Sequence, residues 1–191
     1  SQLQKKDEQQ VQLTFSKGEL ISIDNQEGTP QDVIEKLNKL ASKYAIGRDI
    51  HVGDTILGIK GRVGFEAAAA NIIIKSHHLL EKHTLTKWQL QHKEYLSNWY
   101  GTHLHEGLFL DPVMRDLESF LENSQTQVSG HVYVSLKPYH FTIDGIASEN
   151  DLMDTDFGTY GEENKRWTAD EAKGFIKIYA NQSIIFQNTH K

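Results

Sequence analysis

The pattern of hydrophobic and polar positions changes from a strand period to a helical period within the first part of the chain. Residues 10–15 alternate polar and apolar and predict a half-buried strand, and residues 20–23 predict its hairpin partner. Thr29 and Pro30 then predict a helix start, because threonine caps helices and proline is tolerated in the first turn. Gly47 is expected to end this helix. Its apolar positions follow a helical spacing: Val33, Ile34, Leu37, Leu40, Ala41 and Tyr44.

A glycine-rich segment leads into the most apolar part of the chain. Residues 49–57 look extended, and residues 58–66 hold three glycines around two cations, Lys60 and Arg62. In an extended segment, residues two apart project to the same face, so these two cations are predicted to lie side by side. Residues 67–80 are apolar on nearly every side, which is typical of a buried helix. The sequence predicts an anion-facing segment beside a central helix; the plainer alternative is a turn that feeds a core helix.

Two further helices are predicted in the middle of the chain. Thr84 or Thr86 can cap a helix that ends near Gly107, and Asp111 with Pro112 can begin the next. The inner face of the first helix is expected to hold Leu85, Trp88, His92, Tyr95, Leu96, Trp99 and His103. The inner face of the second is expected to hold Val113, Leu117, Phe120 and Leu121. We interpret the aromatic stripe as core or a subunit interface rather than a ligand cage.

The last third returns to strands before its pattern weakens. Residues 132–136 alternate clearly, and residues 141–143 turn back beside them. Residues 148–161 are acidic and loop-like, Thr168 begins a capping box, and residues 183–186 indicate a strand or short arm. This mixed order favours an α+β fold: a mixed or antiparallel sheet packed with a buried central helix and two long helices.

Composition narrows the class of protein. A chain of 191 residues suits one domain, with residues 1–10 as a mobile lead-in and 11–191 as the folded part. A net charge of −6 without a long basic run argues against nucleic acid as the main partner. No apolar run is long enough to span a membrane, and no signal-peptide core is present. The chain has 0 cysteines, which excludes disulfides and thiolate chemistry.

The residues contain no complete catalytic motif. A phosphate-binding Gly-x-x-x-x-Gly-Lys-Ser/Thr loop, a Ser-Gly-Gly loop, a Gly-x-Ser-x-Gly elbow and a His-Glu-x-x-His pair are all missing. His77 and His78 are adjacent, so on a helix they point about 100° apart and cannot share a metal. His103 and His105 lie in a helical context. We therefore predict no metal site and no catalytic residue in this chain.

The order of several short motifs resembles the argininosuccinate synthase family, over about residues 11–178. The motifs are Ala45-Ile46-Gly47-Arg48, the segment Gly58 to Glu66, His77-His78, Leu85-Thr86, Glu106 to Phe109 with Pro112, and Ala172 to Ile176. Each motif is short, but their order and spacing together are specific. The similarity covers the C-terminal half of that enzyme. The N-terminal half, which carries the Ser-Gly-Gly loop and binds ATP, is absent from this chain.

The resemblance implies an ATP-dependent ligase of arginine biosynthesis in the cytoplasm. ATP adenylates the ureido oxygen of citrulline and releases pyrophosphate; the α-amine of aspartate then displaces AMP to give argininosuccinate. ATP and Mg would be the cofactors of the full-length enzyme, with none expected on this chain, which is expected to be inactive alone. The C-terminal half would supply part of the citrulline pocket and the contacts of a homotetramer.

The resemblance places the citrulline side of the pocket at Gly53, Asp54, Lys60, Arg62 and Phe65. Two of these depart from the family, which usually has glutamate at the position of Gly53 and tyrosine at that of Phe65. Either Asp54 replaces the missing carboxylate, or the substrate differs at its amine. One hypothesis is an N-acylated citrulline whose added acyl carboxylate meets Lys60 or Arg62.

An alternative belongs to a different class of function. The same departures suit a non-catalytic oligomerisation or interaction module that keeps the fold. The family also often ends in a long helix that wraps a neighbouring subunit, whereas residues 183–186 predict a strand or arm. Tetramer formation by that helix is therefore not expected here.

Overall fold

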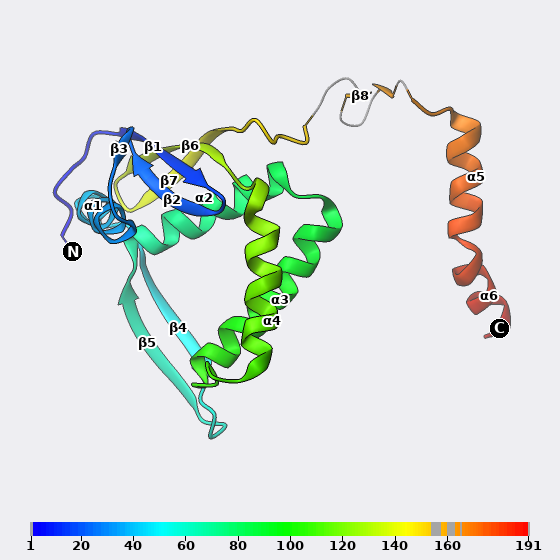
Figure 1. Cartoon of the computed structure of the whole chain (residues 1–191), viewed down its shortest axis with the longest axis horizontal. Helices are drawn as coiled ribbons and strands as arrows, with labels where there is room; N and C mark the ends of the chain where they lie inside the picture. Colours follow the sequence, from blue (N-terminus) through cyan, green and yellow to red (C-terminus); the bar gives the residue numbers. More distant parts are fainter. Residues whose placement is uncertain (1, 154–157, 160–162, 165, 191) are drawn as a thin grey trace. The chain divides into compact units, whose positions relative to one another are not determined.

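The computed structural model describes residues 2–153, 158–159, 163–164 and 166–190. The chain forms two compact units, residues 1–152 and 153–191, which are described separately. The first unit contains the sheet, four helices and a projecting hairpin (Figure 1). Together the elements form an α+β fold, as the sequence predicts.

A five-stranded antiparallel sheet is the base of the first unit. Its strand order is β3-β2-β1-β6-β7. The strands are β1 (Gln9–Ser16), β2 (Glu19–Ile23), β3 (Gln26–Glu27), β6 (Gly130–Lys137) and β7 (His140–Ala147). Alternate side chains of β1 and β6 enter the core, for example Leu13 and its cross-strand partner Val132. The predicted hairpin and the predicted strand at 132–136 are confirmed.

Residues 2–8 precede the sheet without regular structure. The backbone N–H groups of Gln4 and Lys5 both donate to the carbonyl of Lys43, at 2.8 and 3.0 Å. The expected lead-in 1–10 therefore overlaps the start of β1, and its described part has two backbone hydrogen bonds to the end of the first helix.

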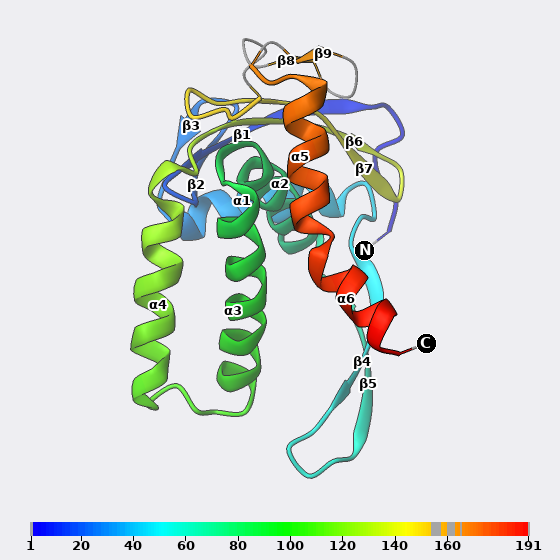
Figure 2. The same ribbon diagram turned by 90° about the vertical axis from the view of Figure 1, so that its right-hand side faces the viewer.

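Helices α1 (Pro30–Ser42) and α2 (Ala68–Thr84) cover one face of this sheet (Figure 2). A capping box between Thr29 and Asp32 begins α1 as predicted. The helix ends at Ser42 rather than at Gly47, and Ala45 already has a left-handed φ of 54°. The buried apolar residues of α1 and α2 are Val33, Leu37, Ala41, Ala68, Ala69, Ile72 and Leu80.

The expectation that α2 is buried on nearly every side is wrong. Ile74 is 67% exposed and its neighbour Lys75 is also exposed. The helix has the sheet and α1 on one side, so its other side faces away from the core. Apolar composition alone overstated its burial, because isoleucine is not excluded from a surface.

Helices α3 (Lys87–His105) and α4 (Pro112–Ser124) form a helical hairpin, followed by the 3-10 turn η1 (Gln125–Gln127). Of the two predicted caps, Thr84 and Thr86, it is Thr86 that caps α3, and it forms a capping box with Gln89. Met114 and Leu117 are the buried apolar residues of α4, whereas Phe120 and Val113 lie at the boundary of exposure.

Of the predicted inner face, Leu85 is buried just before α3 begins, but no residue within α3 is buried. Trp88, Tyr95 and Trp99 are 61%, 62% and 51% exposed. The three aromatic residues have a helical spacing, but α4 packs on α3 elsewhere, for example where the Tyr100 hydroxyl donates to Glu118 at 2.9 Å. The core interpretation of the stripe is wrong, and the subunit-interface interpretation stays a prediction.

The second unit holds α5 (Ala169–Tyr179), α6 (Asn181–Thr189) and the short strands β8 (Gly158–Thr159) and β9 (Glu163–Asn164). Thr168 and Glu171 form the predicted capping box of α5. The strand or arm expected at 183–186 is wrong, because these residues are helical in α6. The loop expected at 148–161 lies partly outside the described residues. The helices expose Phe175, Ile176, Ile178, Tyr179, Ile184, Ile185 and Phe186.

Candidate functional site

The predicted site residues lie on a two-stranded hairpin that projects from the first unit (Figures 1 and 2). Strands β4 (Arg48–Asp54) and β5 (Lys60–Glu66) pair antiparallel along their full length. At the tip, the N–H of Gly58 donates to the Thr55 carbonyl at 2.8 Å. Gly58 has a φ of +75°, which glycine adopts at little cost.

The hairpin is anchored at its base by a close backbone contact. The N–H of Ala67 donates to the carbonyl of Gly47 at 2.9 Å. Gly47 has a φ of +90°, and a Cβ there would lie 2.5 Å from the backbone nitrogen of Ala68. Gly47 therefore lets the start of β4 meet the start of α2, and this contact sets where the hairpin leaves the domain.

The register divides the hairpin side chains between two faces. Cross-strand partners share a face, and neighbours along a strand alternate. We call one the cationic face: Arg48, Ile50, Val52, Asp54, Lys60, Arg62, Gly64 and Glu66. We call the other the histidine face: Asp49, His51, Gly53, Gly61, Val63 and Phe65. The structure thus brings Asp54, Lys60 and Arg62 together, and places Gly53 and Phe65 on the opposite face.

Ion pairs occupy both ends of the cationic face. Lys60 Nζ lies 2.8 Å from Asp54 Oδ1, and Arg48 Nε lies 2.7 Å from Glu66 Oε1. Both pairs are exposed, so each contributes at most about 1 kcal/mol to stability. Arg62 lies between the pairs, and no hydrogen bond or ion pair is found for it among the described residues. The Asp54 carboxylate is directed to Lys60 and lies on the face opposite Gly53.

The histidine face contains a residue that the sequence analysis did not select. A Cβ on Gly53 would lie 2.5 Å from Nε2 of His51, so the imidazole occupies the space that a side chain at position 53 needs. Gly61 is the cross-strand partner of Gly53, and a Cβ there would have nothing within 4 Å. Spacing could have identified His51, because it is two residues before Gly53 on an extended strand.

Apart from the hairpin, a buried polar cluster links α2 to α3 and η1. The side chain of Glu81 has 0% exposure, lies 2.9 Å from Lys93 Nζ, and accepts a 2.8 Å hydrogen bond from Gln125 Nε2. The Oε1 atom of the same Gln125 contacts His77 Nε2 at 2.8 Å. The two hydrogen bonds orient the Gln125 amide and make His77 Nε2 the donor. The cluster ties the helical hairpin to α2.

Burial lowers the pKa of His77 below its ordinary value, against an opposing effect of the Glu81 carboxylate and the Gln125 hydrogen bond. Because the folded pKa is the lower one, the unfolded chain binds the proton more tightly. The stabilising contribution of neutral His77 is complete above about pH 6.5 and is lost as the pH falls through the folded pKa. We expect the free energy of unfolding to decrease between pH 7.5 and 5.5 in the wild type, and to decrease less in His77→Gln.

Urea denaturation at pH 5.5, 6.5 and 7.5 measures this difference. His140→Gln is the control, because His140 is exposed at the start of β7. A His77→Gln variant with the same pH dependence as the wild type would contradict the assignment.

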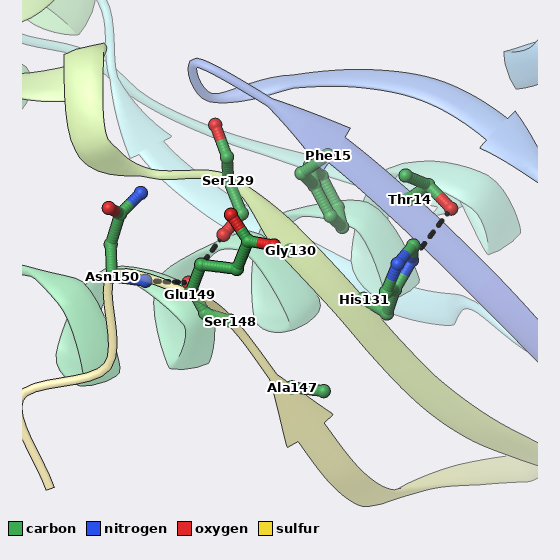
Figure 3. Close-up of a pocket in the computed structure, with 9 residues that line it drawn as sticks. All are labelled: Thr14, Phe15, Ser129, Gly130, His131, Ala147, Ser148, Glu149 and Asn150. Carbon is green, nitrogen blue, oxygen red and sulfur yellow. Dashed lines mark hydrogen bonds between the residues drawn. The ribbon is translucent and has the colours of Figure 1, made fainter.

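A pocket of about 470 Å³ opens on the first unit near the ends of β1, β6 and β7 (Figure 3). Its lining residues are Thr14, Phe15, Ser129, Gly130, His131, Ala147, Ser148, Glu149 and Asn150. His131 Nδ1 lies 3.1 Å from Thr14 Oγ1 and 3.0 Å from Gln12 Nε2. Ser148 Oγ donates to the carbonyl of Ser129 at 2.6 Å. None of the predicted site residues lines this pocket.

The described part of the chain contains no group of three or more His, Asp or Glu side chains placed to hold a metal ion. Within the same residues, no helix is both long and apolar enough to cross a lipid bilayer.

Fold and hairpin together define an α+β domain that carries an open, glycine-rich β-arm. The chain belongs to the family described as arginosuccinate synthase C-terminal domain, whose model matches residues 1–186. This confirms the resemblance found in the sequence.

Curated relatives carry the same name. The chain is 32% identical to an argininosuccinate synthase of Xylella fastidiosa over 95% of this chain and 45% of the relative. It is 33% identical to that of Dictyoglomus turgidum over 97% and 47%, and 37% identical to that of Oceanobacillus iheyensis over 91% and 41%. The chain therefore spans less than half the length of these relatives.

Proposed function

We propose that this chain is the C-terminal part of an ATP-dependent ligase that joins citrulline and aspartate to give argininosuccinate, AMP and pyrophosphate. The observation that carries the proposal is the family match over residues 1–186. The open hairpin supports it, because an exposed arm with glycines on both faces suits one wall of a cleft that another part of the enzyme completes.

The chain's own residues position substrate in this proposal. Citrulline lies against the histidine face, where Gly53 and Gly61 allow close backbone approach and Phe65 supplies an apolar wall. Arg62 meets an anionic group of the substrates from the cationic face, and the Asp54–Lys60 pair holds the hairpin end. Such positioning contributes to rate by fixing the reactants in a productive geometry.

ATP activates the ureido oxygen of citrulline by adenylation, and aspartate then displaces AMP. The sequence has no phosphate-binding loop, and the described residues hold no three-ligand metal group. These residues do not fit Mg-ATP. We propose that a separate part of the enzyme binds the nucleotide, so we expect the chain alone to be inactive. We also propose that the enzyme works in the cytoplasm.

A finer proposal concerns the substrate amine. Gly53 has no carboxylate to pair with an α-ammonium group, and Asp54 lies on the other face. Leaving an ammonium group unpaired in a pocket costs on the order of 1–3 kcal/mol. An N-acylated citrulline has no such charge, and we propose it as the favoured substrate.

Pyrophosphate release tests the ligase proposal. We expect none from the chain alone with ATP, aspartate and citrulline or N-succinylcitrulline, and release when the enzyme contains both this chain and its ATP-binding part. Pyrophosphate release by the chain alone would contradict the proposal that a separate part of the enzyme binds ATP. No release from the combined enzyme with any citrulline substrate would reject the ligase.

The second candidate is a non-catalytic oligomerisation module of the same fold. The exposed aromatic stripe Trp88, Tyr95 and Trp99 on α3 favours it, because aromatic residues are enriched at protein interfaces. Absence of pyrophosphate release together with a stable homo-oligomer would support this function. In the ligase proposal the same surface serves subunit contacts of a homotetramer.

A further inference from the structure

We infer that His51 determines substrate specificity by binding the carboxylate of a dicarboxylic acyl group, such as succinyl, on the citrulline amine. The inference rests on the proposed function and deepens it, because it names the class of acyl group and the residue that recognises it. The supporting observation is the position of His51 relative to Gly53 and to the charged residues of the hairpin.

His51 and the absence of a side chain at position 53 are coupled. The Cβ of any other residue at position 53 would lie 2.5 Å from Nε2 of the His51 imidazole. A side chain at 53 would therefore turn the ring away from its present place. On this face, the His51 imidazole therefore lies where the side chain of a larger residue at position 53 would lie.

The charges of the two faces make His51 the group that can receive an anion beside Gly53. Lys60 and Arg62 project from the cationic face, and Lys60 is paired with Asp54. On the histidine face the other charged residue is Asp49, whose Oδ1 accepts the backbone N–H of Ile50 at 2.7 Å. The backbone of His51 pairs with Val63 in the ladder, but no side-chain hydrogen bond or ion pair of His51 is found within the described part of the chain. Its ring N–H is thus available for a carboxylate.

The same face has room for an acyl chain. Gly61 lies directly opposite Gly53, and neither glycine carries a side chain between His51 and the tip. A Cβ on Gly61 would meet nothing within 4 Å in the described structure. An acyl chain laid over these two glycines brings its terminal carboxylate to the imidazole, whose ring N–H can donate a hydrogen bond to it.

The test compares three substrates in the enzyme that contains this chain and its ATP-binding part. We compare the wild type, His51→Ala and Gly53→Glu by their turnover of citrulline, N-acetylcitrulline and N-succinylcitrulline. We expect His51→Ala to lower kcat/KM for N-succinylcitrulline about tenfold, the usual scale of one charge-assisted hydrogen bond, mainly through KM. Activity with N-acetylcitrulline should change by less than about twofold, because its acyl group carries no charge.

Gly53→Glu should displace the imidazole and add a carboxylate, so it should lower the use of N-succinylcitrulline and raise that of citrulline. His140→Ala is the matched control, since it removes an exposed histidine at the start of β7. Equal losses with all three substrates in His51→Ala would overturn the inference, as would a preference of the wild type for citrulline. Loss of the succinyl preference in Arg62→Gln but not in His51→Ala would also overturn it. Turnover of none of the substrates by the wild type would instead reject the ligase itself.

Discussion

Replacing Lys93 with methionine is expected to lower the free energy of unfolding by about 3–5 kcal/mol, because it leaves the carboxylate of Glu81 buried without its cation. Glu81 is fully buried, and Lys93 Nζ is its charged partner at 2.9 Å. The hydrogen bond from Gln125 remains in the variant, but an amide does not neutralise a charge. Methionine keeps most of the volume of the lysine stem, so the loss reports charge rather than packing.

Urea denaturation at pH 7.5 measures this loss. Lys39→Met is the control: Lys39 pairs with Glu35 at 3.4 Å, with 76% and 53% side-chain exposure. We expect its loss to stay within about 0.5 kcal/mol. The double variant Glu81→Leu with Lys93→Met should recover much of the stability, because it removes both charges. A Lys93→Met loss below about 1 kcal/mol would show that Glu81 finds another partner or water.

The second large effect is expected at the base of the hairpin. Gly47→Ala should destabilise the protein by about 2–4 kcal/mol, since it combines a left-handed backbone with a clash against backbone atoms. The new Cβ would lie 2.5 Å from the nitrogen of Ala68 and 2.7 Å from the carbonyl carbon of Ala67. Backbone atoms cannot move aside as a flexible side chain does. The hydrogen bond from Ala67 to Gly47 should weaken as well.

Gly58→Ala separates the two causes. Gly58 also has a left-handed φ, of +75°, but a Cβ there would meet nothing within 4 Å. We expect a loss of about 1 kcal/mol, which is the conformational cost alone. Thermal unfolding of both variants measures the difference. Equal losses would show that the contact between the start of β4 and α2 does not resist a side chain.

Local signals in the sequence predicted much of the fold. Thr29, Thr86 and Thr168 each begin a helix in a capping box, because the cap depends on residues three positions away. The strands at 10–15 and 132–136 follow from alternation. The helix at 183–186 was missed, because a short apolar run does not distinguish a strand from a helix.

Burial depends on partners that the sequence does not name. Trp88, Tyr95 and Trp99 have a helical spacing, yet the helix that packs on α3 contacts it elsewhere. Ile74 lies on the exposed side of α2 for the same reason. Periodicity gives the face that residues share, but not the element that covers it.

The placement of the candidate site on the hairpin stays a prediction, and the sequence alone did not divide this segment into two faces. The sequence gives the spacing of Lys60 and Arg62, and the β4–β5 register adds that Gly53 and Phe65 point the other way. His51 is not among the predicted site residues, because those positions came from the family resemblance. Its relation to Gly53 depends on the side-chain position, which alternation alone does not give.

The order of strands in the sheet has a consequence for how the chain folds. β1 lies between β2, which follows it directly, and β6, with Phe15 opposite Gly130. The first pairing closes a short loop; the second must wait until more than half of the polypeptide has emerged from the ribosome. Distant pairings of this kind slow folding, because the entropy of a long loop is lost before the contacts form. Until β6 arrives, one edge of β1 and the apolar residues beside it stay uncovered. We therefore expect chaperones to bind and protect the nascent chain at this stage.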